Sequence, residues 1–286
     1  MMLKLALAQI SPVLNDKEKN LNLMRKAIKE SDADLVVFAE LFLTGYMCRD
    51  NLTKLAEPLD GESVKQIVGM AKEYDTYIVF GMPERAKELS GQIFNSAVLV
   101  YPDEKVECYR KLHLANFGPF EEHLYFSRGS KLPVFKTRFG KIGMLICFDC
   151  FFPELSKIYT LKGADILVHI SASPSATRTY FEQVTVTRAI ENTIFFTFTN
   201  LVGTELNMVF WGGNSVVGPR GEIKAKGDYF KEDIVTCEID FKDLNVAREY
   251  RPTIRETRIE LFNELKKLLT DDVRGGLLEQ EKKKQN

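Results

Sequence analysis

The chain has 286 residues, of which 45 % are hydrophobic, so it can bury a large core in one big domain or two. Its 39 lysine and arginine residues nearly balance 40 aspartate and glutamate residues, which argues against a nucleic-acid-binding protein. No apolar run approaches the roughly 18–20 residues that span a membrane, and five scattered cysteines do not resemble a disulfide framework. The N-terminal apolar stretch is too short for a signal peptide, and we expect a soluble, cytoplasmic protein.

The first part of the chain predicts alternating strands and helices. Apolar residues 3–10 predict a buried strand, and Asn15 opens a capping-box pattern before an amphipathic helix. Residues 34–39 and 76–81 predict two more strands, and residues 64–71 between them repeat the helical spacing. The order strand, helix, strand, helix, strand indicates an α/β fold.

A hairpin and a long loop follow. Residues 93–101 and 106–110 predict two strands joined by a short turn, and Lys111 comes directly after the second strand. Residues 116–129 form a loop rich in glycine, proline and aromatic residues, with two consecutive glutamates. Long loops of this kind in compact domains are frequently functional.

The rest of the chain returns to strands and helices. Further strands are expected at residues 142–146, 165–170, 193–200, 208–217, 222–226 and 234–239, and helices at 154–163, 179–192 and 253–269. We expect a single domain over residues 1–270. The charged tail, residues 271–286, is expected to be a frayed or partner-contacting end.

A cysteine lies at the end of one predicted strand. The apolar run ending at Ile146 predicts the strand, and Pro153 with Glu154 suits the first turn of a helix, so Cys147 lies in the loop between them. Open α/β folds place chemistry at strand carboxyl ends, where free backbone N–H groups favour a thiolate. Cys147 is therefore a candidate nucleophile. The alternatives are a buried structural cysteine and a redox pair with Cys150.

Glu40, Lys111 and Cys147 each directly follow an apolar strand. Strand ends in a sheet-based fold can converge on one edge. A carboxylate base, an ammonium and a thiol together suffice for acyl transfer through a covalent intermediate. The three residues are therefore the candidate reactive group.

Other polar residues near these positions are expected to be structural. Asp149 is interpreted as a hydrogen-bond acceptor that fixes its loop, and Cys150 as a packing residue. The histidines do not supply a convincing base, and we expect them to be structural hydrogen-bonding residues: His113, His123 and His169.

Several segments resemble the nitrilase superfamily of carbon–nitrogen hydrolases. The matching segments are residues 37–42 with 44–46, 109–114, 143–149 with 152–154, 188–192, 213–215 and 219–221. The resemblance implies a four-layer α-β-β-α sandwich with two related halves. It also implies assembly into at least a homodimer, and no metal or organic cofactor.

The resemblance also assigns roles. Cys147 corresponds to the family's nucleophile, Glu40 to its general base, and Lys111 to the cation that faces the tetrahedral intermediate. The Phe148 backbone N–H is expected to help hold the oxyanion.

Many members of the superfamily need a second glutamate. Glu122 is preferred over Glu121 for this role, because it lies three residues before Tyr125 as the family pattern requires. Tyr46 and the aromatic loop at residues 117–120 are expected to wall the pocket. Arg178 is interpreted either as an anchor for a substrate carboxylate or as a solvated residue at a helix start.

The expected reaction is hydrolysis of a small linear amide or N-carbamoyl compound through a Cys147 thioester, with release of ammonia. Family nitrilases usually follow the nucleophile with Trp-Glu, whereas this chain has Phe148-Asp149, which favours the amidase and carbamoylase branches. Nitrile hydrolysis and a redox protein that uses Cys147 and Cys150 remain the alternatives. The expected partners are a small-molecule substrate and a second copy of the chain, without nucleic acid or membrane.

Overall fold

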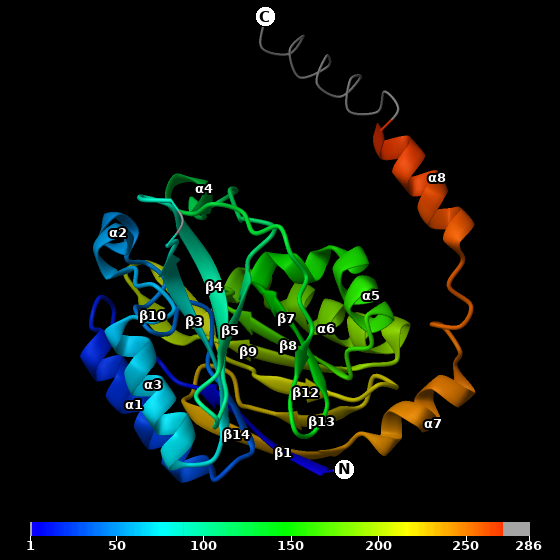
Figure 1. The fold of residues 1–286 in the computed structure, drawn as a ribbon, viewed down its shortest axis with the longest axis horizontal. Coiled ribbons are helices and arrows are strands. Elements are labelled where there is room, and N and C mark those ends of the chain that lie inside the picture. The colour runs from blue at the N-terminus through cyan, green and yellow to red at the C-terminus, as the bar shows by residue number, and fades with distance from the viewer. Residues whose placement is uncertain (1, 88, 271–286) are drawn as a thin grey trace, which may run out of the picture.

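Two six-stranded sheets face each other in the computed structural model, which describes residues 2–87 and 89–270 (Figure 1). The predicted charged tail at 271–286 lies outside these residues. The first sheet has the order β14 (Asp233–Asp240), β1 (Met2–Gln9), β2 (Leu35–Val37), β3 (Tyr77–Arg85), β4 (Ile93–Val100) and β5 (Val106–Arg110). The second has the order β13 (Ile223–Lys226), β12 (Ser215–Val217), β9 (Phe195–Asn200), β8 (Ile166–Ser171), β7 (Lys141–Ile146) and β6 (Phe135–Lys136).

The two sheets share one topology. In the first, β1, β2 and β3 are parallel, β14 pairs antiparallel on one side, and β4 and β5 pair antiparallel on the other. In the second, β7, β8 and β9 are parallel, with β6 on one side and β12 and β13 on the other. The chain thus consists of two related halves, as the family resemblance implies.

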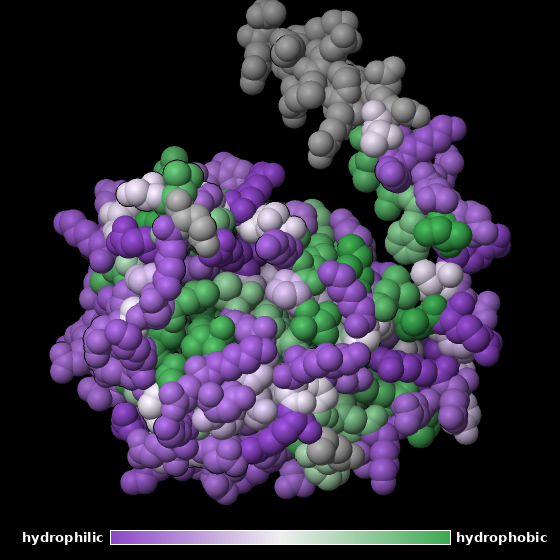
Figure 2. Space-filling view, in the orientation of Figure 1, coloured by the Kyte–Doolittle hydropathy of each residue, from purple (hydrophilic) through white to green (hydrophobic). Residues whose placement is uncertain are grey.

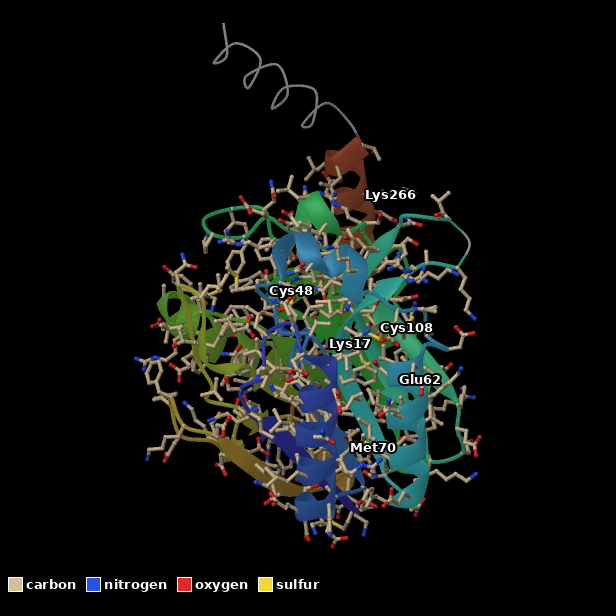
Figure 3. The ribbon with its side chains drawn as sticks, turned by 90° about the vertical axis from the view of Figure 1, so that its left-hand side faces the viewer. Lys17, Cys48, Glu62, Met70, Cys108 and Lys266 are labelled. Carbon is tan, nitrogen blue, oxygen red and sulfur yellow. The ribbon has the colours of Figure 1, made fainter. Side chains whose placement is uncertain are left out.

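Helices cover the outer face of each sheet. The helices α1 (Lys17–Ser31) and α3 (Glu62–Glu73) lie side by side against the first sheet (Figure 3), and α5 (Pro153–Leu161) and α6 (Arg178–Asn192) cover the second. This arrangement confirms the expected four-layer α-β-β-α sandwich. The smaller elements are η1 (Arg49–Asn51), α2 (Leu52–Leu55), α4 (Glu122–Tyr125), η2 (Cys147–Phe151), η3 (Ser175–Thr177), the hairpin β10 (Val202–Glu205) and β11 (Met208–Trp211), α7 (Lys242–Tyr250) and α8 (Ile259–Thr270).

Strand β1 shows how the sequence divides the core. Side chains alternate between the two faces of a strand. Leu3, Leu5 and Leu7 belong to the core cluster that includes β7 of the opposite sheet, while Ala6 and Ala8 belong to the cluster beneath α1. The leucines fill the space between the sheets, and the small alanines allow the helix to approach. None of the described helices is long and apolar enough to cross a membrane.

Three local predictions were wrong. The N-cap of α1 is Asp16 rather than Asn15, because Asn15 has a left-handed backbone (φ 63°) and the Asp16 carboxylate accepts from the Lys19 N–H at 3.0 Å. The single strand expected at 208–217 is two strands, because Gly212 and Gly213 between them are both left-handed. The last helix begins at Ile259 instead of residue 253, and α7 before it was not predicted.

The substitution Gly81→Ala is expected to destabilise the fold. A Cβ at Gly81 in β3 would lie 2.2 Å from the Leu41 backbone nitrogen and 2.7 Å from the Ala39 carbonyl oxygen. These are backbone atoms that cannot rotate away, so we expect a loss of about 1–3 kcal/mol in the free energy of unfolding, measured by urea denaturation.

Gly69→Ala is the matched control for this test. Gly69 lies exposed within α3, and an added Cβ meets nothing within 4 Å. The same exchange should therefore raise stability by about 0.5–1 kcal/mol, because alanine is the better helix former. Equal effects of the two substitutions would contradict this account of Gly81.

Candidate active site

A buried ammonium lies between two carboxylates where β5 ends. The Lys111 Nζ is 2.8 Å from Glu40 Oε1 and 2.7 Å from Glu122 Oε1. The exposed fractions of these side chains are 0 % for Lys111 and Glu40 and 3 % for Glu122. Burial alone lowers the pKa of Lys111, but the charges of Glu122 and Glu40 outweigh it and raise the pKa well above its usual value. Lys111 therefore stays protonated.

Glu40 is held by donors from both halves of the fold. Its Oε1 also accepts from the Asn95 side-chain amide at 2.7 Å, and its Oε2 accepts from the Ala172 backbone N–H at 2.7 Å. Burial raises the pKa of Glu40, and the neighbouring Lys111 acts in the opposite direction. The carboxylate is thereby fixed in orientation and made more basic by its surroundings.

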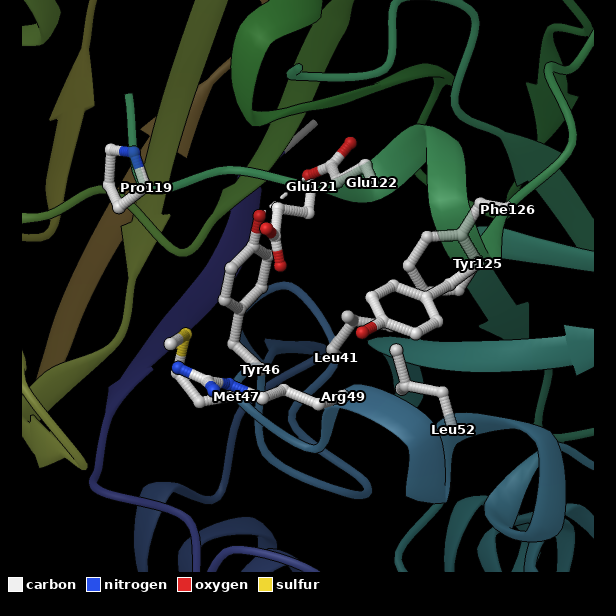
Figure 4. A pocket seen from close by; sticks show the side chains of 10 residues that line it. All are labelled: Leu41, Tyr46, Met47, Arg49, Leu52, Pro119, Glu121, Glu122, Tyr125 and Phe126. Carbon is white, nitrogen blue, oxygen red and sulfur yellow. Dashed lines mark hydrogen bonds between the residues drawn. The ribbon is translucent and has the colours of Figure 1, made fainter. Parts of the chain in front are cut away.

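Glu122, rather than Glu121, contacts the lysine. Its Oε1 also accepts from the Tyr46 hydroxyl at 2.8 Å (dashed line in Figure 4), and its Oε2 accepts from the Ala115 N–H at 3.0 Å. Glu121 is exposed and lines a small cavity of about 50 Å³ that Glu122 also borders (Figure 4). The geometry thus favours the predicted choice between the two glutamates.

Cys147 opens the η2 turn directly after β7, in the left-handed conformation (φ 45°). Its thiol is buried, with the residue 5 % exposed. Burial raises the pKa of the thiol, the negative charges of Glu40 and Glu122 raise it further, and Lys111 opposes them. All three charges act on the thiol, and its raised pKa keeps it protonated at neutral pH. Nucleophilic attack by this sulfur therefore requires a proton acceptor.

Asp149 fixes the turn that carries Cys147. Its carboxylate accepts from the Tyr109 hydroxyl at 2.7 Å and from the backbone N–H groups of His113 at 2.9 Å and Ile146 at 3.2 Å. This confirms its interpretation as a loop-fixing acceptor.

The histidines lie in three different settings. His113 also contacts Asp149 through its ring and stacks on Phe152. His169 is buried, and its Nε2 lies 3.0 Å from the Cys147 carbonyl oxygen, while exposed His123 lies beside Arg128. The first two are structural hydrogen-bonding residues, as expected.

A second cavity, of about 230 Å³, contains Cys147 in its wall. Phe148 lines it, as does the aromatic loop through Phe117 and Phe120. Tyr46 does not line this cavity and lines the small cavity beside Glu122 instead. Arg178 lines neither cavity. Its guanidinium group instead lies over the Tyr229 ring, with the guanidinium carbon 4.8 Å from the ring centroid.

Several supporting groups were not foreseen. Asn95, with Ser96 after it, interrupts an otherwise apolar strand, a signal that could have identified it. The Ala172 and Ala115 N–H groups have no signature in the sequence, because every residue type except proline carries a backbone N–H. Glu205 of β10 is a buried carboxylate that accepts from the backbone N–H groups of Tyr46 at 2.9 Å and Met47 at 2.8 Å, and it holds the tyrosine loop in place.

The sequence profile of the carbon–nitrogen hydrolase family matches residues 4–249. The chain belongs to this family. It is therefore a carbon–nitrogen hydrolase. Within the described ranges, no group of three or more His, Cys, Asp or Glu side chains is arranged to hold a metal ion.

Similar proteins carry amidase and nitrilase names. The chain is 32 % identical over 269 residues to a probable nitrilase of Schizosaccharomyces pombe, covering 91 % of this chain and 97 % of that protein. It is 32 % identical over 274 residues to the omega-amidase NIT2 of Xenopus tropicalis, covering 91 % and 96 %. The crystal structure of a carbon–nitrogen hydrolase from Helicobacter pylori superposes with a TM-score of 0.84 at 28 % identity, covering 92 % of this chain and 98 % of that one.

The buried histidine predicts an acid-sensitive fold. Burial lowers the pKa of His169 to about 4, below the value near 6.5 of an unfolded chain, so the unfolded state binds the proton more readily between these values. The contribution of His169 is complete above about pH 6.5 and is lost as the pH falls towards 4, by roughly 3 kcal/mol at most. Urea unfolding at a series of pH values should show this loss, and His169→Gln should make the slope shallower. Identical slopes for both proteins would contradict the assignment.

Proposed function

We propose that this carbon–nitrogen hydrolase cleaves the C–N bond of a small linear amide or N-carbamoyl compound through a Cys147 thioester and releases ammonia. The observation that carries the proposal is the buried Lys111 ammonium between Glu40 and Glu122, in electrostatic contact with the Cys147 thiol. The amidase names among similar proteins support the same reaction class.

The first half of the reaction forms the thioester. Glu40 accepts the thiol proton as the Cys147 sulfur attacks the carbonyl carbon, since the free thiol is protonated. The oxyanion of the tetrahedral intermediate faces the Lys111 ammonium and the Phe148 backbone N–H. Collapse breaks the C–N bond, and Glu40 returns its proton to the departing ammonia.

The second half releases the acid. Glu40 accepts a proton from a water molecule as the water oxygen attacks the thioester carbonyl. The C–S bond then breaks, and Glu40 returns the proton to the departing sulfur of Cys147. Preorganised donors at such an oxyanion typically contribute about 3–4 kcal/mol each. Glu122 keeps the Lys111 ammonium in place, with Tyr46 as its own donor.

Nitrile hydrolysis is the second candidate, because some similar proteins are named nitrilases. The same cysteine would add to the nitrile carbon, and the Phe148-Asp149 sequence after it is the feature that favours amides. Cys150 is fully buried and its pKa is raised by burial, which argues against a redox pair. The five free cysteines fit the cytoplasmic location that we propose.

Replacing the reactive groups should abolish ammonia release. For an amide that the wild type hydrolyses, Cys147→Ala and Glu40→Gln are expected to lower kcat/KM by at least ~10³-fold, because the first removes the nucleophile and the second removes the proton acceptor. The assay is ammonia release across short amides, ω-amides, carbamoyl amines and the matching nitriles.

Cys150→Ser is the control for these variants. Replacing this thiol, three residues from Cys147, by a hydroxyl should leave kcat/KM within a few-fold of wild type. In a redox protein that uses both cysteines, the same substitution would abolish function. Hydrolysis that survives Cys147→Ala would rule out the thioester mechanism.

We also propose that the protein is a homodimer and that α8 contacts the partner. In Figure 1, α8 extends away from the two sheets, and Figure 2 shows hydrophobic side chains along it. The exposed apolar residues of this helix are Ile259, Leu261, Phe262, Leu265, Leu268 and Leu269. A helix of 12 residues with an exposed apolar face has only marginal stability in water by itself. We therefore expect a second copy of the chain to bury this face.

Leu265→Glu should therefore weaken the dimer. A charge in the apolar face of α8 opposes burial against a partner, so we expect a rise of at least ~10-fold in the dimer dissociation constant. Analytical ultracentrifugation measures it. Lys266→Glu, on the neighbouring polar position, is the control and should change association little. A monomeric wild type would contradict the proposal.

A further inference from the structure

The cavity beside Cys147 is walled by aromatic rings. Beyond the cysteine, six aromatic side chains line its volume of about 230 Å³: Phe117, Phe120, Phe148, Phe151, Tyr180 and Phe181. Among the described residues that line it there is no charged side chain. Phe117 and Tyr180 are 49 % and 61 % exposed, whereas Phe120 and Phe181 are buried, so the wall runs from solvent inward to the thiol.

The rings hold one another in place. Phe117 contacts Phe120 and Phe148 with centroids 5.5 and 4.9 Å apart, and Phe148 contacts Phe151 at 5.9 Å. Phe151 in turn meets Phe181 edge-on at 5.0 Å. Such edge and tilted contacts stabilise a preformed wall. The cavity is therefore a built apolar surface next to the sulfur, and it does not depend on a single side chain.

The charges nearby disfavour an anionic substrate group. The reactive cluster contains one ammonium, Lys111, and two carboxylates, Glu40 and Glu122. Arg178, the residue expected as a carboxylate anchor, lies over the Tyr229 ring outside the cavity. A carboxylate placed among the rings would lose its hydration without gaining a cation.

We propose that the acyl part of the substrate is apolar and carries, beyond its carbonyl, either a branched or straight chain of about five or six carbons or a phenyl ring. A cavity of roughly 150 Å³ lined by apolar side chains is enough to bind benzene, so the larger space beside Cys147 accommodates such a group. The inference rests on the proposed amide hydrolysis and specifies which amides fit. Amides that carry a carboxylate at the far end of the chain are excluded from this cavity.

A pair of isosteric substrates tests the proposal. 5-Methylhexanamide and glutaramate have the same chain length and shape, but one ends in an isopropyl group and the other in a carboxylate. The wild-type enzyme should hydrolyse 5-methylhexanamide with a kcat/KM at least 10-fold higher than that for glutaramate. A preference for glutaramate would overturn the apolar assignment and leave amide hydrolysis itself intact.

Phe117→Arg tests the wall directly. Phe117 is half-exposed, so an arginine there can be tolerated by the fold, and it would supply a cation at the cavity. The preference for 5-methylhexanamide should fall by at least 10-fold in this variant. Leu89→Arg is the matched control, because Leu89 is 60 % exposed and does not line the cavity, and it should keep the wild-type preference. An unchanged preference in Phe117→Arg would overturn the role of this wall.

Binding without turnover separates the two proposals. Isothermal titration of the Cys147→Ala variant with each amide measures selectivity even where no ammonia is released. Selective binding of 5-methylhexanamide without turnover by wild type would support the apolar cavity and count against the hydrolytic proposal. Failure to bind either amide, together with no turnover, would overturn the inference.

Discussion

The site depends on one buried ammonium. Lys111 has no contact with solvent, and two carboxylates lie within 2.8 Å of its nitrogen. Breaking a buried ion pair by removing one partner typically costs about 3–5 kcal/mol, because it leaves an uncompensated charge in a medium of low polarity. The positions of Glu40 and Glu122 are therefore coupled to the lysine and to each other. Asn95, Tyr46 and the N–H groups of Ala172 and Ala115 occupy further carboxylate lone pairs, so the cluster is closely satisfied and rigid.

The sandwich provides the place for this cluster. Strands β2, β5 and β7 end close together although they lie far apart in the sequence, because the two sheets pack face to face. Glu40 and Lys111 follow strands of the first sheet, and Cys147 follows a strand of the second. The close backbone approach at Gly81 sets the path of the chain just after Glu40. Packing between the sheets therefore determines the distance from carboxylate to sulfur.

Sequence patterns predicted this arrangement unevenly. Apolar runs located most strands, and residues 106–110 were predicted with the bounds that β5 has. The polar residues at strand ends indicated Glu40, Lys111 and Cys147. By contrast, α7 was not predicted. Strands β11 and β12 were predicted as one strand, because hydrophobic periodicity does not show that the two glycines between them adopt a left-handed backbone.

The partners of the site were harder to predict. Glu205 holds the loop of Tyr46 from a hairpin about 160 residues away, a contact that depends on how the halves dock. Backbone donors such as the Ala172 N–H have no signature in side-chain chemistry. The position of Arg178 also depended on tertiary structure, because the Tyr229 ring that it covers comes from a later segment.

The division of the site between two related halves has a consequence for the unassembled chain. The carboxylate of Glu40 accepts an N–H from the second half, and the sulfur of Cys147 belongs to that half. While the sheets are apart, as in a nascent or partly melted chain, the thiol lacks the Glu40 carboxylate and the Lys111 ammonium that act on it in the folded chain. In the mechanism proposed above, reactivity therefore arises only at the final docking step, and incomplete molecules carry an ordinary cysteine.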